Sequence, residues 1–95
     1  MSNKIEAEWD ENKNQQNQRK HQVSFQEAAT VFNDTLALIV PDDEHSWSEQ
    51  RYHIIGESNL GDLLVVTYTE RGDRVRIISA RYPTRREKRD YEEGN

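Results

Sequence analysis

A small α+β domain is the fold class that this sequence predicts, and three observations predict it. The chain has 95 residues, which suffices for one hydrophobic core but not for two. Its apolar residues follow helical spacing in one segment and strand-like alternation or short aliphatic runs in several others. Capping boxes, S-x-x-E at 24–27 and T-x-x-E at 84–87, mark two helix starts. We therefore expect residues 1–95 to form a single domain.

The N-terminal segment predicts a short strand followed by an unusual helix. Residues 4–8 alternate Ile5 and Ala7 with charged residues, which is typical of an edge strand, and Asp10 is placed to cap a helix. This helix, over residues 11–21, contains no aliphatic side chain. A helix that is polar on every face gains nothing from core packing. We expect it to be marginal, or to lie against something outside its own domain.

The rest of the chain predicts one buried helix, four strands and a basic C-terminal helix. The second helix follows Ser24 and places Phe25, Ala28 and Phe32 at helical spacing. A buried strand is expected at residues 36–40. Three further strands near residues 51–56, 63–69 and 74–80 predict an antiparallel meander, and the last helix is expected near 84–92. The expected order is β-α-α-β-β-β-β-α, with an antiparallel sheet of four to five strands, two N-terminal helices and a C-terminal helix.

Charge and composition exclude several classes of protein. No cysteine is present, so the chain has no disulfide and no thiolate nucleophile. The first ten residues carry charges and no apolar run, and no segment is long enough to span a membrane. We expect a cytoplasmic protein without membrane contact. Net charge is −5, yet residues 71–90 hold eight Lys or Arg against three Asp or Glu.

This basic segment is a possible phosphate site. Alternation over residues 74–80 puts Arg74, Arg76 and Ile78 on one face and Val75, Ile77 and Ser79 on the other. Arg81 follows at the end of the strand, close to the start of the helix that carries Arg85, Arg86 and Arg89. Guanidinium groups and free helix N–H groups together suit a phosphate. A solvated basic face paired with Glu70, Asp73 and Glu87 is the alternative.

Metal chemistry is not predicted, whereas acid–base chemistry is. His21, His45 and His53 lack the spacing of metal ligands, and residues 41–50 resemble no calcium loop, so we expect an exposed acidic loop and neither metal nor cofactor. His21 follows Lys20 at the end of the polar helix, where its imidazole can titrate near neutrality. Both cations could equally serve only to favour the helix C-terminus.

Two runs of residues resemble the BrnT toxin family. The first comprises Trp9-Asp10, Lys13, Asn17, Lys20-His21, Val23-Ser24-Phe25, Glu27-Ala28, Val31-Phe32 and Asp34. The second comprises Arg76-Ile77-Ile78-Ser79-Ala80-Arg81, Thr84, Glu87 and Tyr91. The family pattern usually has glycine where this chain has Gln22, and Gly-Arg where it has Gly61-Asp62. Gln22 would cost about 1 kcal/mol in a left-handed conformation.

The resemblance implies the toxin of a type II toxin–antitoxin pair with a RelE-like fold. It implies a metal-independent endoribonuclease that is inhibited by a BrnA-like antitoxin, in an assembly that is commonly a heterotetramer and that contacts operator DNA only through the antitoxin. On this interpretation Arg76 and Arg81 stabilise the transition state, Lys20 and His21 are the acid–base pair, and Tyr68 assists. The residues expected to bind the RNA backbone are Lys13, Arg51, Arg74, Arg85 and Arg86.

Two other functions stay open on the sequence alone. The fold could serve as a non-enzymatic module that only holds an antitoxin-like partner and contributes to autoregulation of the operon. It could also be a basic adaptor unrelated to RNA, with its arginines paired to the acidic loop. Cleavage that survives EDTA would favour the RNA-cleaving toxin, and tight partner binding with intact RNA would favour the binding module. Strong salt dependence of RNA binding would count against the adaptor.

Overall fold

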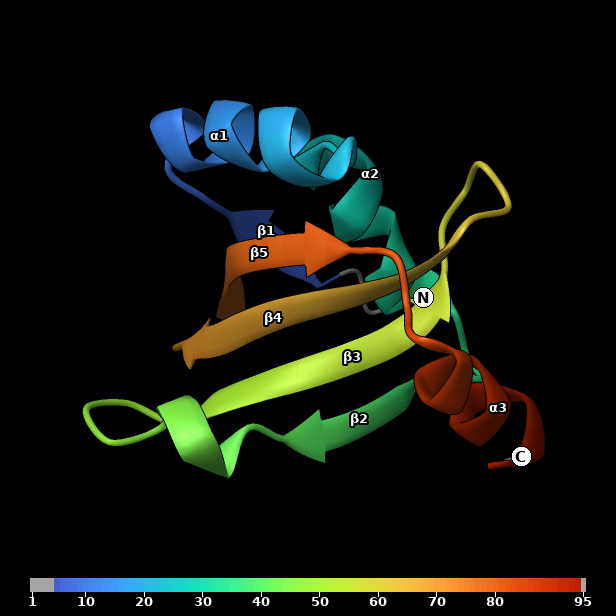
Figure 1. The fold of residues 1–95 in the computed structure, drawn as a ribbon. Coiled ribbons are helices and arrows are strands. Elements are labelled where there is room, and N and C mark those ends of the chain that lie inside the picture. The colour runs from blue at the N-terminus through green and yellow to red at the C-terminus, as the bar shows by residue number, and fades with distance from the viewer. Residues whose placement is uncertain (1–4, 95) are drawn as a thin grey trace.

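The computed structural model describes residues 5–94, which form a mixed α+β fold with a five-stranded sheet (Figure 1). The predicted fold class is confirmed. In chain order the elements are β1 (Glu6–Glu8), α1 (Glu11–His21), α2 (Phe25–Thr30), the 3₁₀ helix η1 (Val31–Asn33), β2 (Leu38–Pro41), the 3₁₀ helix η2 (Asp43–His45), β3 (Arg51–Glu57), β4 (Leu63–Arg71), β5 (Arg74–Arg81) and α3 (Arg85–Glu93). In the described part of the chain, no helix combines the length and the apolar composition that a membrane span needs.

The sheet has the strand order β1-β5-β4-β3-β2. Strands β3 to β5 form the antiparallel meander that the sequence predicts, and β2 adds an antiparallel strand at the edge. The expectation of a buried strand at residues 36–40 is wrong, because β2 is largely exposed and Ile39 is 53% exposed. The expectation of a wholly antiparallel sheet is wrong at one edge, where β1 pairs with β5 in parallel and Ala7 lies opposite Val75. The predicted first strand began at Lys4, which lies outside the described residues. Parallel neighbours need a long connection between them. Here α1, α2 and strands β2 to β4 lie between β1 and β5 in the chain, so β5 can run beside β1 in the same direction.

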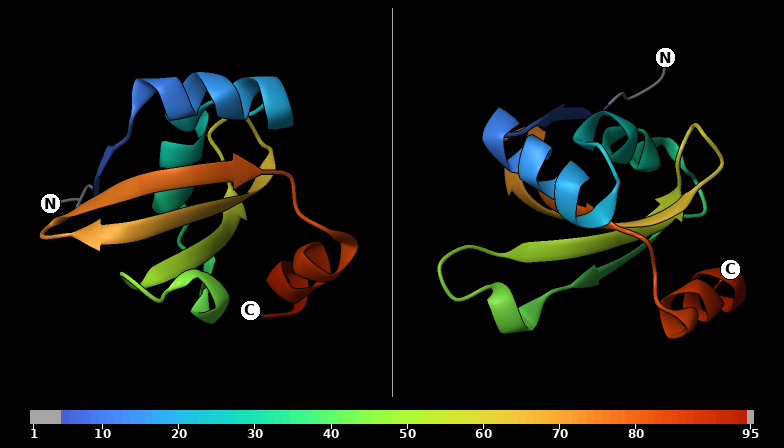
Figure 2. Two further views of the ribbon diagram at one scale, coloured as in Figure 1. Left: turned by 60° about the vertical axis from the view of Figure 1, so that its left-hand side comes forward. Right: turned by 45° about the horizontal axis from the view of Figure 1, so that its top comes forward.

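One face of the sheet is covered by α1 and α2, while α3 lies on the other side (Figure 2). Tyr52, Ile54, Val66, Tyr68 and Ile77 project toward the two N-terminal helices, as their pairing across the strands requires. The buried core on this face comprises Val23, Phe25, Ala28, Val31, Ile54, Leu64, Val66, Tyr68, Val75, Ile77 and Ala80. This face is closed to substrate.

The polar helix α1 packs on its own domain, contrary to the expectation that it would be marginal or would contact something outside. Its buried residues are Asn14 and Asn17, which are 0% and 7% exposed. Asn14 Oδ1 accepts the Phe25 amide at 2.8 Å, and the Asn17 side chain bonds the backbone of Val23 and Ala80. Side-chain amides thus replace aliphatic contacts, because each buried amide finds backbone partners.

The connection between α1 and α2 turns at a left-handed residue. Gln22 has φ 60° and ψ 28°, and its amide N–H donates to the Gln18 carbonyl at 2.9 Å. This is the conformation in which the family pattern has glycine. The hydroxyl of Ser24 then accepts the Glu27 amide at 3.1 Å, so the predicted cap of α2 is present.

A β-bulge in β5 decides which residues face the open side of the sheet. Thr67 lies opposite Ser79, whereas Tyr68 lies opposite Ile77, so that Ile78 has no partner on β4. Strict alternation had put Ser79 on the face of Val75 and Ile77, and this prediction is wrong. The extra residue turns Ser79, and Arg81 after it, to the open face.

Candidate active site

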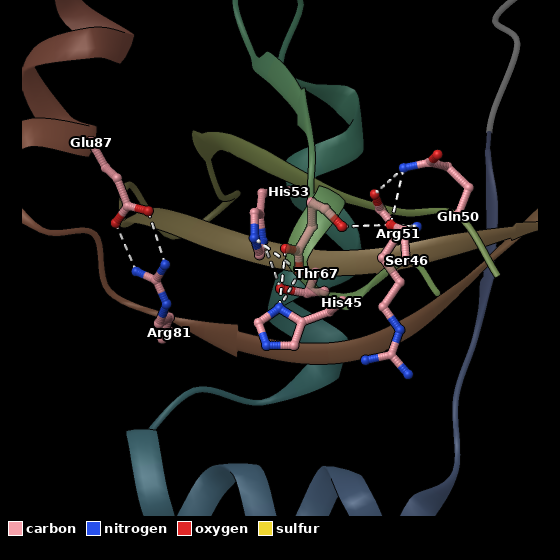
Figure 3. A network of polar contacts seen from close by, with 9 residues as sticks. His45, Ser46, Gln50, Arg51, His53, Thr67, Arg81 and Glu87 are labelled. Atoms are coloured by element: carbon pink, nitrogen blue, oxygen red, sulfur yellow. Dashed lines mark hydrogen bonds and ion pairs between the residues drawn. The ribbon is translucent and has the colours of Figure 1, made fainter. Parts of the chain in front are cut away.

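The open face of the sheet contains a pocket of about 450 Å³ between the loop after β2 and the strands β3, β4 and β5 (Figure 3). The register of the strands explains why these residues line one pocket, because His53, Thr67 and Ser79 lie opposite one another on β3, β4 and β5. The lining residues are Asp42, Glu44, His45, Arg51, His53, Thr67, Ile78, Ser79 and Arg81. We call this the strand pocket.

A buried carboxylate lies at one wall of the strand pocket. Asp42 is 8% exposed, and its backbone N–H donates to the Arg51 carbonyl at 2.9 Å, which fixes the residue beside β3. Its carboxylate lies 3.0 Å from His45 Nδ1 and 3.3 Å from His53 Nε2. The expected exposed acidic loop is therefore wrong at Asp42, which two imidazoles bind and shield.

The hydrogen-bond chain continues from His53 into the sheet. His53 Nδ1 lies 2.8 Å from Thr67 Oγ1, and the Thr67 side chain is 9% exposed. The chain is satisfied when Thr67 donates to His53 Nδ1, His53 donates from Nε2 to Asp42, and His45 donates from Nδ1 to Asp42. Under this assignment both imidazoles are neutral and His45 Nε2 is left as an acceptor.

Arg81 forms the second wall of the strand pocket and is held by α3. Its Nη1 and Nη2 donate to Glu87 Oε1 at 2.7 Å and Oε2 at 2.9 Å, a bidentate pair. Hydrogen bonding to Arg81 lowers the pKa of the Glu87 carboxyl to about 2. The same contact raises the pKa of Arg81. Glu87 also accepts the Thr84 amide at 2.9 Å and so completes the capping box of α3.

Arg51 contributes a second guanidinium to the strand pocket. Its Nε is buried and, within residues 5–94, has no hydrogen-bond partner. A buried guanidinium N–H without an acceptor is costly. Arg51 has no ion pair among residues 5–94, whereas Arg81 shares its donors with Glu87.

A second pocket of about 250 Å³ lies between α1 and β5. It is lined by Lys13, Gln16, Asn17, Lys20, His21, Ile78 and Ser79. Ile78 and Ser79 also line the strand pocket, so both hollows border the bulge of β5. We call the second one the helix pocket. The bulge thus has imidazole and cationic side chains on both of its sides.

A family model described as the ribonuclease toxin BrnT of a type II toxin–antitoxin system matches residues 9–87. The chain belongs to the BrnT family. Membership makes it the toxin of a type II pair and implies an antitoxin partner and an RNA substrate. The crystal structure of the Brucella abortus ribonuclease toxin BrnT is similar, with a TM-score of 0.65 and 25% sequence identity over 85% of this chain and 99% of that one. No curated protein sequence matches the chain.

The structure brings together five of the ten residues that the BrnT resemblance singled out. Lys13, Lys20 and His21 line the helix pocket, while Arg51 and Arg81 line the strand pocket. Each pocket therefore contains at least one candidate acid–base or phosphate-binding residue and borders the bulge of β5. The roles assigned to them from the sequence remain predictions.

Tyr68 is not at either pocket of this BrnT chain. Its ring is 6% exposed in the core on the helix-covered face, stacked on Tyr52 at 5.5 Å and edge-on to Phe32 at 4.9 Å. Burial raises the pKa of its hydroxyl. The expected assistance by Tyr68 has no structural support, because alternation along β4 turns it away from Thr67 and the open face.

Arg76 lies on the open face but apart from Arg81. Four steps of the ladder separate the two residues, which is about 13 Å along the strand. Arg76 Nη1 is 3.6 Å from Glu8 Oε2. The two arginines therefore do not converge on one phosphate as expected. The remaining predicted RNA-binding arginines line neither pocket: Arg74 is ion-paired to Glu6 at 3.3 Å, and Arg85 and Arg86 are exposed on α3.

The residues that sequence reasoning missed are Asp42, His45, His53 and Thr67. A local signal existed, since Asp42 and His45 are three residues apart and can meet on a single helical turn, here η2. His53 and Thr67 gave no such signal, because only the strand register brings them together. In residues 5–94, no group of three or more His, Cys, Asp or Glu side chains is arranged to hold a metal ion.

Proposed function

We propose that this BrnT family member is a metal-independent endoribonuclease with a RelE-like fold, which cleaves RNA at the bulge of β5. The observation that carries the proposal is that the strand pocket and the helix pocket share Ile78 and Ser79 in their linings. Phosphate-binding arginines stand on one side of these residues, and Lys20 and His21 stand on the other. The family description as ribonuclease toxins supports the same reaction.

The residues present can supply what RNA cleavage needs. The ribose 2′-hydroxyl is an internal nucleophile, so the protein has to move two protons and stabilise the charge on phosphorus. Arg51 and Arg81 would neutralise the phosphate, with Lys13 holding a neighbouring phosphate in the helix pocket. Lys20 and His21 would exchange protons with the reacting oxygens.

Inhibition by a cognate antitoxin completes the proposal. We expect a BrnA-like protein that binds the toxin in a heterotetramer and alone contacts operator DNA, with both proteins in the cytoplasm. The net charge of −5 argues against general binding of nucleic acid by the toxin itself, because the phosphate backbone attracts basic surfaces. Cation-lined pockets on an acidic protein fit a short stretch of RNA instead.

The test is incubation of antitoxin-free protein with a mixed RNA pool in EDTA, followed by mapping of the fragment ends. Fragments with 2′,3′-cyclic phosphate ends are expected, and Arg81→Ala should remove them. Arg71→Ala is the matched control, because Arg71 is an arginine at the far end of β4 that is paired only with Glu49 at 3.4 Å. Cleavage that needs a divalent ion would contradict the proposal.

A second function is favoured by one observation, the pairing of arginines with carboxylates. Arg81, Arg76 and Arg74 all contact glutamates, which leaves fewer free cations than the sequence implied. On this basis the fold would act only as a module that binds its antitoxin and supports repression of the operon. Intact RNA after incubation with folded protein, together with tight antitoxin binding, would establish this alternative.

A further inference from the structure

We infer that His45, in place of Lys20, is the general base of the RNA-cleaving reaction, with His21 as the acid and Asp42 as the positioning residue of His45. The inference rests on the proposed function and adds a residue to which the sequence analysis gave no catalytic role. His45 lies at the strand pocket, with its Nδ1 3.1 Å and 3.0 Å from the two Asp42 oxygens. A carboxylate that accepts from Nδ1 fixes the tautomer in which Nε2 carries the free electron pair.

Exposure distinguishes His45 from His53. The His45 side chain is 61% exposed, and within the described chain its Nε2 has no hydrogen-bond partner. His53 is 25% exposed and has both ring nitrogens engaged, Nδ1 by Thr67 and Nε2 by Asp42. Only His45 can therefore offer a nitrogen to a substrate without first breaking a hydrogen bond. His53 contacts Asp42 through Nε2 and is itself held by Thr67 at Nδ1.

The position of His45 suits an in-line displacement on phosphorus. Attacking and leaving oxygens stand on opposite sides of the phosphorus, so the base and the acid must do the same. His45 lines the strand pocket and His21 lines the helix pocket, and Ile78 and Ser79 at the bulge line both. A phosphate at the bulge would have one imidazole on each side and Arg81 beside it.

The reaction step balances with these two groups. His45 Nε2 takes the proton of the 2′-hydroxyl, and the O2′–P bond forms as the P–O5′ bond breaks. The leaving O5′ takes a proton from the imidazolium of His21, which lies in the last turn of α1 and lines the helix pocket. The products are a 2′,3′-cyclic phosphate and a 5′-hydroxyl. Nothing is oxidised or reduced, and the transferred protons leave His45 charged and His21 neutral.

The experiment compares two RNAs cut at the site mapped with the wild-type protein, one ordinary and one with sulfur in place of the bridging O5′. A thiolate is a far better leaving group than an alkoxide and needs no proton, so the sulfur substrate restores a variant that lacks the acid but not one that lacks the base. The variants are His45→Ala and His21→Ala, each with its thermal midpoint measured to establish folding. Asp42→Asn is paired with its exposed neighbour Asp43→Asn as the matched control.

For His45→Ala we expect a loss of about 10²- to 10⁴-fold on both RNAs, the range that general acid–base catalysis supplies. His21→Ala should lose activity on the ordinary RNA and regain it on the sulfur one. Asp42→Asn should lower kcat with an unchanged KM, while Asp43→Asn cleaves as the wild type does.

Three results would overturn the assignment. A His45→Ala protein that cleaves ordinary RNA within about threefold of the wild type removes His45 from catalysis. Recovery of His45→Ala on the sulfur substrate makes it the acid, not the base. A folded wild-type protein that leaves all RNA intact would contradict the proposed function and, with it, this inference. The first two results would contradict only the assignment of His45.

Discussion

The side-chain amide of Asn17 pairs with both backbone groups of Ala80. Asn17 Nδ2 donates to the Ala80 carbonyl at 2.8 Å, and the Ala80 amide donates to Asn17 Oδ1 at 3.1 Å. Strand β1 pairs only with residues 74–76 of β5, so the later part of this edge lacks a neighbouring strand. The asparagine supplies the two missing ladder bonds and attaches α1 to the sheet beside the bulge. Asn17 also lines the helix pocket.

Replacing Asn17 with alanine should lower the free energy of unfolding by about 3 kcal/mol. The change leaves the N–H and C=O of Ala80 buried without partners, at about 1 to 3 kcal/mol for each group. Urea denaturation measures the loss. Asn12→Ala is the control, because Asn12 is exposed on the same helix. Equal midpoints for the two variants would mean that the Asn17 bonds contribute nothing.

Gln22→Gly should stabilise the protein by about 1 kcal/mol. The residue has φ 60°, a conformation that a side chain with Cβ disfavours and glycine adopts freely. The same substitution at Gln15, an exposed position inside α1, should destabilise the fold by about 1 kcal/mol. Glycine there raises the conformational entropy of the unfolded chain and relieves no strain in the folded one. Relative to the wild type, the denaturant midpoint should shift upward for Gln22→Gly and downward for Gln15→Gly. A destabilised Gln22→Gly protein would contradict it.

Local patterns predicted the elements well because capping boxes and apolar runs act within a few residues. Ser24 and Thr84 cap the expected helices, and the four antiparallel strands follow the predicted segments. The candidate site was harder to predict because it depends on contacts between distant residues. A one-residue bulge at Ile78 reverses the faces of Ser79 and Arg81, and no local signal marks it.

Buried polar residues explain the other wrong expectations. Asn14 and Asn17 look like surface residues in a sequence, and only their backbone partners, up to 63 residues away, make them interior ones. Asp42 likewise reads as part of an acidic surface loop until His53, eleven positions along, covers its carboxylate. Composition rules assign polar residues to the surface, so they fail wherever such residues are fully hydrogen-bonded.

Gly56→Ala should destabilise the fold by about 1 to 3 kcal/mol through overpacking. A Cβ added at Gly56 would lie 2.9 Å from Val31 Cγ1 and 3.1 Å from Ala37 Cβ. The double variant with Val31→Ala removes the nearest atom, so its loss should be smaller than the sum of the two single losses. Additive losses by urea denaturation would show that the contact with Val31 is not the cause.

Glu87→Gln should lower stability by about 1 to 2 kcal/mol at pH 7, since it weakens a charge-assisted pair with Arg81. Because Arg81 lowers the pKa of Glu87 from 4.5 to about 2, the unfolded chain binds this proton more readily than the folded one. The stability that the pair contributes is therefore complete above pH 4.5 and is lost as the pH falls toward 2.

The measurement is the urea denaturation of the wild type and of Glu87→Gln at a series of pH values between 7 and 2. Their difference in unfolding free energy should stay constant down to about pH 5 and then shrink toward zero. Glu92→Gln, exposed on the same helix, should follow the wild type throughout. A difference that is unchanged at the acid end would mean that the effect of Glu87 comes from the cap of α3 and not from its charge on Arg81.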